Sequence, residues 1–522
     1  MDFLKQLKSI TWCKPNWAYL SVTKETNEFL TKCKELQKPD PFDDVEEIIK
    51  KSDAFPIKFP IDTVRLVQLK SKRPIERLKK NIVSTYPLIH ERVLILMTRF
   101  LTYKKQFGSN IEKDFYKEMT VQQFIERILK KRAASFYGPS DKYLLLTGET
   151  GASGWELVGS SEQKEPLLLE NCLSYDELKL SAMVYVSGYT DCINDGNRKN
   201  SGVVKDDDIE DNAVIIGLIG PRVKRRGKMD HEDIIVTRDQ NIQEHGYGFA
   251  NKPHQRNKLL WRRMWCEFYE NENVTYEKAT ILIDKQNKYE SRPYIDRYQY
   301  KKRYKKVIFD NESYYKRICV LAESTLLEAE YRAVESEKYA FVNVIGCGLG
   351  VWIMLPHQGD VYVLTFLERI HSLLQENMLN HISDVNFAYV NVSSGIEGLF
   401  TVDTEHKEIP LRKLFIEYDG HPKGGINVQM HNREPSSKLS GDHAGKLLVM
   451  TYPWDSNAHP GNEFWCGLLA STGDSAAASS TQIAELHNAH INPAVSADNV
   501  RVVGRHGLKT LSEYCHDLTT SN

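Results

Sequence analysis

Apolar and charged positions alternate at helical spacing through the first 130 residues, with prolines between the segments. In Val64–Leu69 and Phe124–Leu129 the apolar residues recur so that they share one face of a helix. The pattern predicts a mainly helical N-terminal region over residues 1–130.

Short β-rich runs replace this pattern from Lys142 onward, and clusters of Gly, Asn and Asp separate them. The acidic, glycine-containing stretch 194–211 is predicted to be a mobile loop. Residues 312–337 have helical character, and strands and helices alternate from Tyr339 to the end. The chain therefore predicts an α/β sheet after the helical region. The strand-like runs are 143–147, 182–189, 213–220, 233–237, 340–345 and 446–452.

A glycine turn follows the apolar run 340–345 and precedes a predicted helix. Glycines let backbone amides surround an anion, and a following helix adds its positive end. The third glycine of a Rossmann motif would stand at Val351, and no Gly-Lys-Ser/Thr of a Walker loop follows. Taken alone, the turn is either a plain connector or a diphosphate cradle.

A polar loop follows the run 446–452 and carries Asp455, Asn457, Glu463 and, further on, Asp474. Open α/β sheets bind ligands at the carboxyl ends of their strands, so the loop is predicted to lie in an active site. Asp474 is expected either to contact a ligand or to cap the helix that begins near Ser475. Its position alone favours the N-cap.

Composition limits the classes of protein that fit. The formal net charge of −1 gives no overall field for nucleic acid or an acidic membrane, and Lys224-Arg225-Arg226 is a local basic cluster, expected to be solvated surface. Nine cysteines without a Cys-x-x-Cys pair favour a reducing compartment, the cytoplasm or nucleus. Neither a signal peptide nor a long apolar span is apparent, so secretion and membrane insertion are not expected.

Metal and thiol chemistry find little support. No pair of histidines stands at metal-binding spacing beside a carboxylate, and we expect no metal and no cofactor. Cys347 and Cys466 lie near the two loops but without an accompanying His-Asn arrangement, so they are expected to be apolar fillers.

Both loops together resemble those of a known family. Gly346-Cys347-Gly348-Leu349-Gly350 is similar to the diphosphate loop of poly(ADP-ribose) glycohydrolase-type macrodomains, and the loop from Asn457 through Asp474 is similar to their catalytic loop, in reversed order. Over roughly 140–510 the chain resembles more closely the MavL-like macrodomain hydrolases. The motifs that carry this resemblance are Val214–Arg222, Gly348–Trp352, His443–Lys446, and Trp454-Asp455 with Asn457 and Pro460–Glu463.

The resemblance implies a macrodomain-like mixed sheet flanked by helices over 131–522, with a β-rich elaboration at about 140–300 and residues 1–130 outside it. It implies removal of mono-ADP-ribose from modified arginine side chains of proteins, with ubiquitin a conceivable substrate and ADP-ribose the product. Asp455, Glu463 and Asp474 would be the catalytic carboxylates. The expected ligand contacts are Asn457 to ribose, Gly346, Gly348, Leu349, Gly350 and Val351 to the diphosphate, Trp352 as a wall of the site, and Phe249 stacked on adenine.

Other functions remain open at this stage. An ADP-ribose reader would have the same cradle without turnover, and a nucleotide-dependent transferase or dehydrogenase would bind NAD more tightly than ADP-ribose. Trp465 is expected either to wall the site or to pack in the core. The helices of residues 1–130 could serve as an adaptor for a partner.

Overall fold

The computed structural model describes residues 3–10, 12–36, 39–138, 140–249, 252–286, 292–301, 304–403 and 411–520. The predicted helical region contains helices α1 to α8, and one strand that the pattern did not predict, β1. The helix N-termini are capped as their sequences allow: Thr120 and Gln123 form a capping box at α8. These elements are α1 (Phe3–Ser9), α2 (Lys24–Cys33), α3 (Val45–Asp53), α4 (Leu66–Leu69), α5 (Ile75–Val83), β1 (Tyr86–His90), α6 (Glu91–Phe107), α7 (Asn110–Tyr116) and α8 (Val121–Lys130).

Within the described residues, eleven strands form one mixed sheet, so the α/β prediction is confirmed at that level. Their order is β12-β13-β14-β11-β10-β15-β6-β5-β1-β16-β17. The strands are β5 (Val184–Asp191), β6 (Asn212–Leu218), β10 (Ala340–Ile345), β11 (Ile382–Ala388), β12 (Thr401–Asp403), β13 (Leu411–Glu417), β14 (Gly425–Met430), β15 (Leu447–Pro453), β16 (Arg501–Gly504) and β17 (Gly507–Thr510), together with β1.

Strands β14, β11, β10, β15 and β6 are mutually parallel, so their carboxyl ends lie along one edge of the sheet. The middle strands are buried on both faces, which explains their nearly continuous apolar sequences. β5 runs antiparallel to β6, and β1 pairs with β5 on one side and with β16 on the other. The N-terminal region therefore supplies an inner strand of the sheet.

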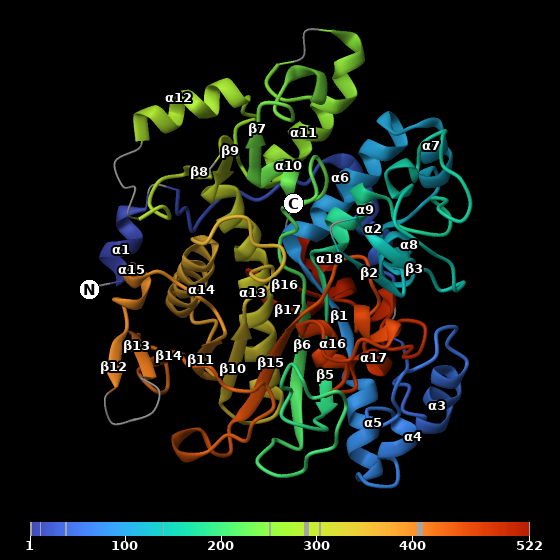
Figure 1. Ribbon diagram of the computed structural model, residues 1–522, viewed down its shortest axis with the longest axis vertical. Coiled ribbons are helices and arrows are strands. Elements are labelled where there is room, and N and C mark those ends of the chain that lie inside the picture. The colour runs from blue at the N-terminus through green and yellow to red at the C-terminus, as the bar shows by residue number, and fades with distance from the viewer. Residues whose placement is uncertain are drawn as a thin grey trace.

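Helices α13 (Asn311–Glu335) and α14 (Gln358–Gln375) pack together, and α13 crosses the sheet from β10 and β11 to β1 and β16 (Figure 1). The prediction of a helix over 312–337 is confirmed within two residues. Asp310 caps α13 by accepting hydrogen bonds from the amides of Glu312 and Ser313. The remaining helices are α9 (Tyr175–Ser181), α10 (His231–Ile234), α11 (Arg256–Phe268), α12 (Tyr276–Gln286), α15 (Ser394–Glu397), α16 (Gly473–Ala478), α17 (Ile483–Leu486) and α18 (Leu511–Thr520).

Two small sheets lie beside the main one. One contains β2 (Ser135–Tyr137), β3 (Lys142–Leu144) and β4 (Thr150–Gly151), and the other contains β7 (Ile235–Thr237), β8 (Tyr298–Lys301) and β9 (Tyr304–Asp310). The part of the chain that the structure describes contains no helix both long and apolar enough to cross a membrane.

Candidate functional site

A cavity of about 560 Å³ opens where the parallel strands end. This size falls within the range of small-molecule sites, and the carboxyl edge of parallel strands is where such sites form. Loops that follow β14, β11, β10, β15 and β6 all contribute to its lining. The cavity therefore extends along the edge of the sheet, past these strands in that order.

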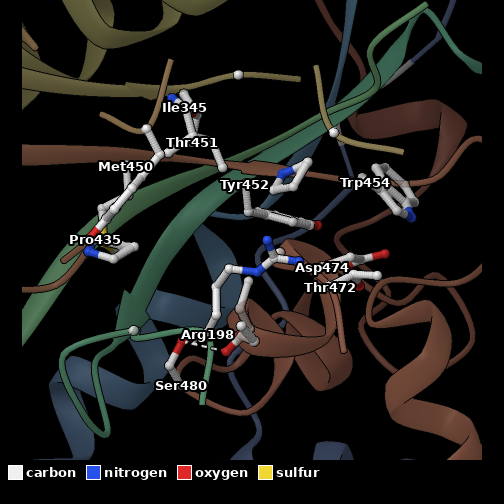
Figure 2. Close-up of a pocket in the computed structure, with 18 of the residues that line it drawn as sticks. Arg198, Ile345, Pro435, Met450, Thr451, Tyr452, Trp454, Thr472, Asp474 and Ser480 are labelled. Carbon is white, nitrogen blue, oxygen red and sulfur yellow. Dashed lines mark hydrogen bonds between the residues drawn. The ribbon is translucent and has the colours of Figure 1, made fainter. Parts of the chain in front are cut away.

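The floor of the cavity is apolar and lies on the face of the sheet opposite α13. Ser187 on β5 donates a hydrogen bond to Glu328 of α13, and Ser187 pairs with Ile216 across the strands. Because side chains alternate along a strand, Ile215 and its partner Met450 point to the other face. Both line the cavity with Tyr452, as Figure 2 shows for Met450 and Tyr452.

The glycine turn after β10 forms one wall. The predicted ligand contacts Gly346, Gly348, Leu349, Gly350, Val351 and Trp352 all line the cavity. Gly348 has a φ of 76°, which a side chain rarely adopts. A Cβ on Gly220, after β6, would lie 2.3 Å from the carbonyl carbon of Cys347, so glycine at 220 lets the two loops touch. The following helix α14 begins only at Gln358, so the turn rather than a helix end faces the cavity.

The loop after β15 and the first turn of α16 bring two of the predicted carboxylates to the cavity, Asp455 and Asp474. One oxygen of Asp474 accepts a hydrogen bond from the amide of Gly461 at 2.8 Å, and its other oxygen has no partner among the described residues. Asp474 does not cap α16, because Thr472 does so through Ser475. The N-cap interpretation of Asp474 is therefore wrong, and its second oxygen is available to a ligand.

Glu463 completes an acid cluster with Asp455 and Asp474, although it does not line the cavity. It accepts a hydrogen bond from the hydroxyl of Thr472 at 3.1 Å. Burial raises the pKa of Glu463, and the charge of Asp455 raises it further. Burial and then Asp455 likewise raise the pKa of Asp474 well above its ordinary value.

Asp455 has the more favourable surroundings for a charge. Burial raises its pKa, but Arg222, with 3.9 Å between charged atoms, and a hydrogen bond from the Asn462 amide both lower it. Arg222 is itself buried, and its guanidinium lies 4.0 Å from the ring centre of Trp352. Trp352 therefore walls the acidic end of the cavity and holds the arginine that faces Asp455.

Asn457 and Phe249 lie away from the cavity, and Trp465 takes the core position that was one of its two expected alternatives. Asn457 is fully buried and does not line the cavity, because its backbone carbonyl is tied to the amide of Ala133 and its side chain points into the interior. Phe249 is 87% exposed and lines a separate hollow near Tyr19 and Arg263, so it does not reach the cavity. Trp465 packs in the core at 4.9 Å from Phe55, between ring centres.

Sequence reasoning missed the opposite wall. Residues 196–199, within the stretch predicted to be a mobile loop, line the cavity and are held at two points. Asn197 donates a hydrogen bond to Glu434 at 2.9 Å, and Arg198 donates one to the carbonyl of Ser471 at 3.2 Å. We call residues 196–199 the strap. Figure 2 shows Arg198 extending into the cavity from the side opposite Tyr452.

The end of the cavity under β11 and β14 was also missed. Tyr389, Glu434 and Pro435 line it, and the hydroxyl of Tyr389 donates a hydrogen bond to Glu434 at 3.0 Å. Tyr389 has a φ of 57° and is 54% exposed, which is an unusual conformation for a tyrosine directly after a strand. The positive φ and the exposure of Tyr389 are properties of the folded chain, so the sequence could not reveal them.

No group of three or more His, Cys, Asp or Glu side chains among the described residues is arranged to hold a metal ion. Burial raises the pKa of Cys347 to about 12, so its thiol is a poor nucleophile in this setting.

Comparison with known proteins gives one family and two relatives. A family model described as "ADP-ribosylhydrolase MavL-like" matches residues 46–517. From Drosophila melanogaster, ADP-ribosylarginine hydrolase CG2909 is 39% identical over 494 residues, which cover 93% of this chain and 92% of the relative. ADP-ribosylarginine hydrolase CG3568 is 38% identical over 504 residues, or 94% and 92%. Because the family match begins at residue 46, the expectation that residues 1–130 lie outside the resemblance is wrong for residues 46–130.

Proposed function

Because the chain belongs to the MavL-like family of ADP-ribosylhydrolases, we propose that it hydrolyses the bond between ADP-ribose and modified arginine side chains of proteins. The observation that carries the proposal is the joining of an acid cluster to a glycine-walled cavity of suitable size. The names of both Drosophila relatives specify the same bond. We further propose that β14, β11, β10, β15 and β6 form a macrodomain-like core within residues 131–522, and that residues 1–130 support it through β1.

The order of the strands gives the ligand a direction. From β14 to β6 the edge of the sheet spans about 19 Å at the usual strand spacing. The acid cluster lies at the β15 and β6 end, the glycine turn lies in the middle, and Tyr389 and Pro435 lie at the β11 and β14 end. This order supports an ADP-ribose with its distal ribose over Asp455 and Asp474 and its diphosphate against Gly346–Val351.

The adenosine end of the ligand then contacts Tyr389 and Pro435, and not Phe249 as expected from the sequence. The exposed ring of Tyr389 offers a stacking surface, and Pro435 offers an apolar one. One carboxylate oxygen of Glu434 accepts hydrogen bonds from both Tyr389 and Asn197. Its other oxygen is left to accept a hydrogen bond from the adenine amino group. Arg198 faces the diphosphate region from the strap, on the side away from the glycine turn.

The three acids have different roles in the proposed reaction, because their surroundings differ. Asp455, kept closer to ionised by Arg222 and Asn462, accepts a proton from water as the water oxygen bonds to the anomeric carbon. Asp474, whose raised pKa favours the protonated form, gives its proton to the departing guanidine nitrogen as the carbon–nitrogen bond breaks. Glu463 positions Thr472 and adds negative charge that stabilises the developing positive charge of the ribose.

Proteins modified on arginine are the proposed substrates, with ubiquitin among them by family resemblance. The test is release of ADP-ribose from peptides modified on arginine or on serine, by the wild type and by Asp455→Ala. Release from the arginine peptide that is lost in Asp455→Ala, with ADP-ribose still bound, is the expected result. Tight ADP-ribose binding without release from either peptide would make the protein a reader instead.

A further inference from the structure

A basic loop stands at the acidic end of the cavity, where the modified protein must leave it. Residues 224–228 lie between β6 and α10 and include four cationic side chains, one of which, Arg225, pairs with Asp141 at 3.1 Å. We call the others, Lys224, Arg226 and Lys228, the basic rim. No ion pair holds any of these three within the described part of the chain.

The loop that carries the basic rim is firmly anchored at both ends. At its start, Arg222 is buried beside Asp455, and its amide donates a hydrogen bond to Asp230 at 2.8 Å. At its end, Asp230 is buried and accepts a hydrogen bond from Arg317 of α13 at 3.1 Å. The basic rim between these anchors, in which Lys224 and Arg226 are exposed and Lys228 is half-buried, is therefore held in a fixed position.

The basic rim adjoins the cavity directly. The ammonium group of Lys224 donates a hydrogen bond to the carbonyl of Val351, a residue of the glycine turn that is 69% exposed. Val351 also lines the cavity, as does Arg222 two residues before Lys224. A polypeptide that holds its modified arginine over Asp455 would leave the cavity across Val351 and Lys224.

Carboxylates near the basic rim are already occupied. Asp141 is buried and pairs with Arg225, Asp176 is bonded to Lys104 at 2.6 Å and interacts with Lys228 at longer range, and Glu232 is bonded to Lys179 at 2.8 Å. The rim thus keeps a net positive charge in a protein whose overall formal charge is −1. A local field of this kind selects partners by charge.

We propose that the basic rim selects substrate proteins whose modified arginine is flanked by acidic side chains. The inference rests on the proposed function, because it requires the scissile bond to lie over the acid cluster. It adds the chemistry of the protein side of the substrate, which the cavity itself does not contact.

The test compares two peptides modified on one arginine, with aspartates or with asparagines at the flanking positions. At low ionic strength we expect a kcat/KM about fivefold higher for the acidic peptide, since each surface ion pair contributes a small factor. The preference should shrink in 0.5 M salt because exposed charges are screened.

The variant Arg226→Glu/Lys228→Glu should abolish or reverse the preference, and the neutral Arg226→Gln/Lys228→Gln should lie between. Using the ratio of the two peptides within each variant removes any effect of partial unfolding. The matched control is Lys338→Glu/Lys423→Glu, because these exposed lysines precede β10 and β14 at the other edge of the sheet. It carries the same charge change and should keep the preference.

Equal hydrolysis of both peptides by the wild type would overturn the rim proposal and leave the proposed function intact. A preference unchanged in Arg226→Glu/Lys228→Glu would overturn it as well. Release from neither peptide would overturn both. Binding of single-stranded RNA that is lost in the same variant, without any peptide preference, would assign the rim to nucleic acid instead.

Discussion

Replacing Asp474 by asparagine should have opposite effects on activity and on stability. Asp474 is buried, only one of its oxygens is bonded, and Asp455 and Glu463 lie close enough to raise its pKa. At neutral pH its ionised form is therefore costly to the native state. Asparagine keeps the oxygen that accepts from Gly461 and removes the charge.

The direction of the pH dependence follows from the raised pKa. Protonated Asp474 is favoured in the folded protein, so its contribution is most favourable below the ordinary value of 3.8 and is lost as pH rises through the raised pKa. At pH 7 we expect Asp474→Asn to increase the free energy of unfolding by roughly 1–3 kcal/mol, because it removes a buried charge that lies near two other carboxylates. The gain should fade as pH approaches 4.

The same substitution should lower kcat by about 10²- to 10⁴-fold, because it removes the proton donor. Hydrolysis is followed as ADP-ribose released from the arginine-modified peptide, and stability by urea unfolding at pH 7 and at pH 5. Calorimetric binding of ADP-ribose verifies that the site remains assembled.

Glu323 provides the matched control, since it is a buried acid of the opposite kind. Burial would raise its pKa, but hydrogen bonding to His90 and the charge of Arg369 together lower it to about 2. Its contribution is present above pH 4.5 and lost as pH falls through 2, so Glu323→Gln should cost about 3 kcal/mol at pH 7. The electrostatic reasoning would be refuted if Asp474→Asn destabilised the protein at pH 7, or if it increased the free energy of unfolding equally at every pH.

Other substitutions test the remaining parts of the cavity. Arg198→Ala should weaken ADP-ribose binding about tenfold, with partial recovery in Arg198→Lys, because a charge-assisted bond to the diphosphate is lost; equal affinity would remove the strap from the site. Tyr389→Ala should raise the Kd for ADP-ribose about tenfold and Tyr389→Phe far less, since the ring supplies stacking; equal losses would assign the effect to the hydroxyl. Gly220→Ala should displace the backbone at Cys347 and weaken diphosphate binding, which is measured as the inhibition constant of inorganic pyrophosphate. An inhibition constant equal to that of the wild type would contradict the close packing of the two loops. Hydrolysis should persist in excess chelator. A loss of activity that a divalent cation reverses would contradict a mechanism that uses carboxylates alone.

The local pattern of apolar residues was sufficient to predict much of the sheet. The runs at 340–345 and 446–452 became β10 and β15, because strands buried on both faces need nearly continuous apolar residues. The same logic placed Asp455 and the glycine turn at the carboxyl ends of neighbouring strands. β1 was missed because its five residues stand between two helices and carry no alternation of their own.

The rest of the site depends on contacts between distant segments. Thr472, not Asp474, caps α16, and either residue type suits that position. Tyr389 and Arg198 approach the glycine turn only through the sheet order and the strap. Phe249 follows a glycine-rich stretch like those of binding loops, but its surroundings place it in a different hollow.

The two strands that pair with β1 are synthesised at very different times. β5 follows β1 within the first half of the chain, whereas β16 begins at Arg501. Closing so long a loop is slow, so on the ribosome β1 exposes an unpaired edge until β16 has been synthesised. An unpaired inner edge invites pairing with other chains. Nascent or C-terminally truncated forms should therefore depend on chaperones far more than the finished protein does.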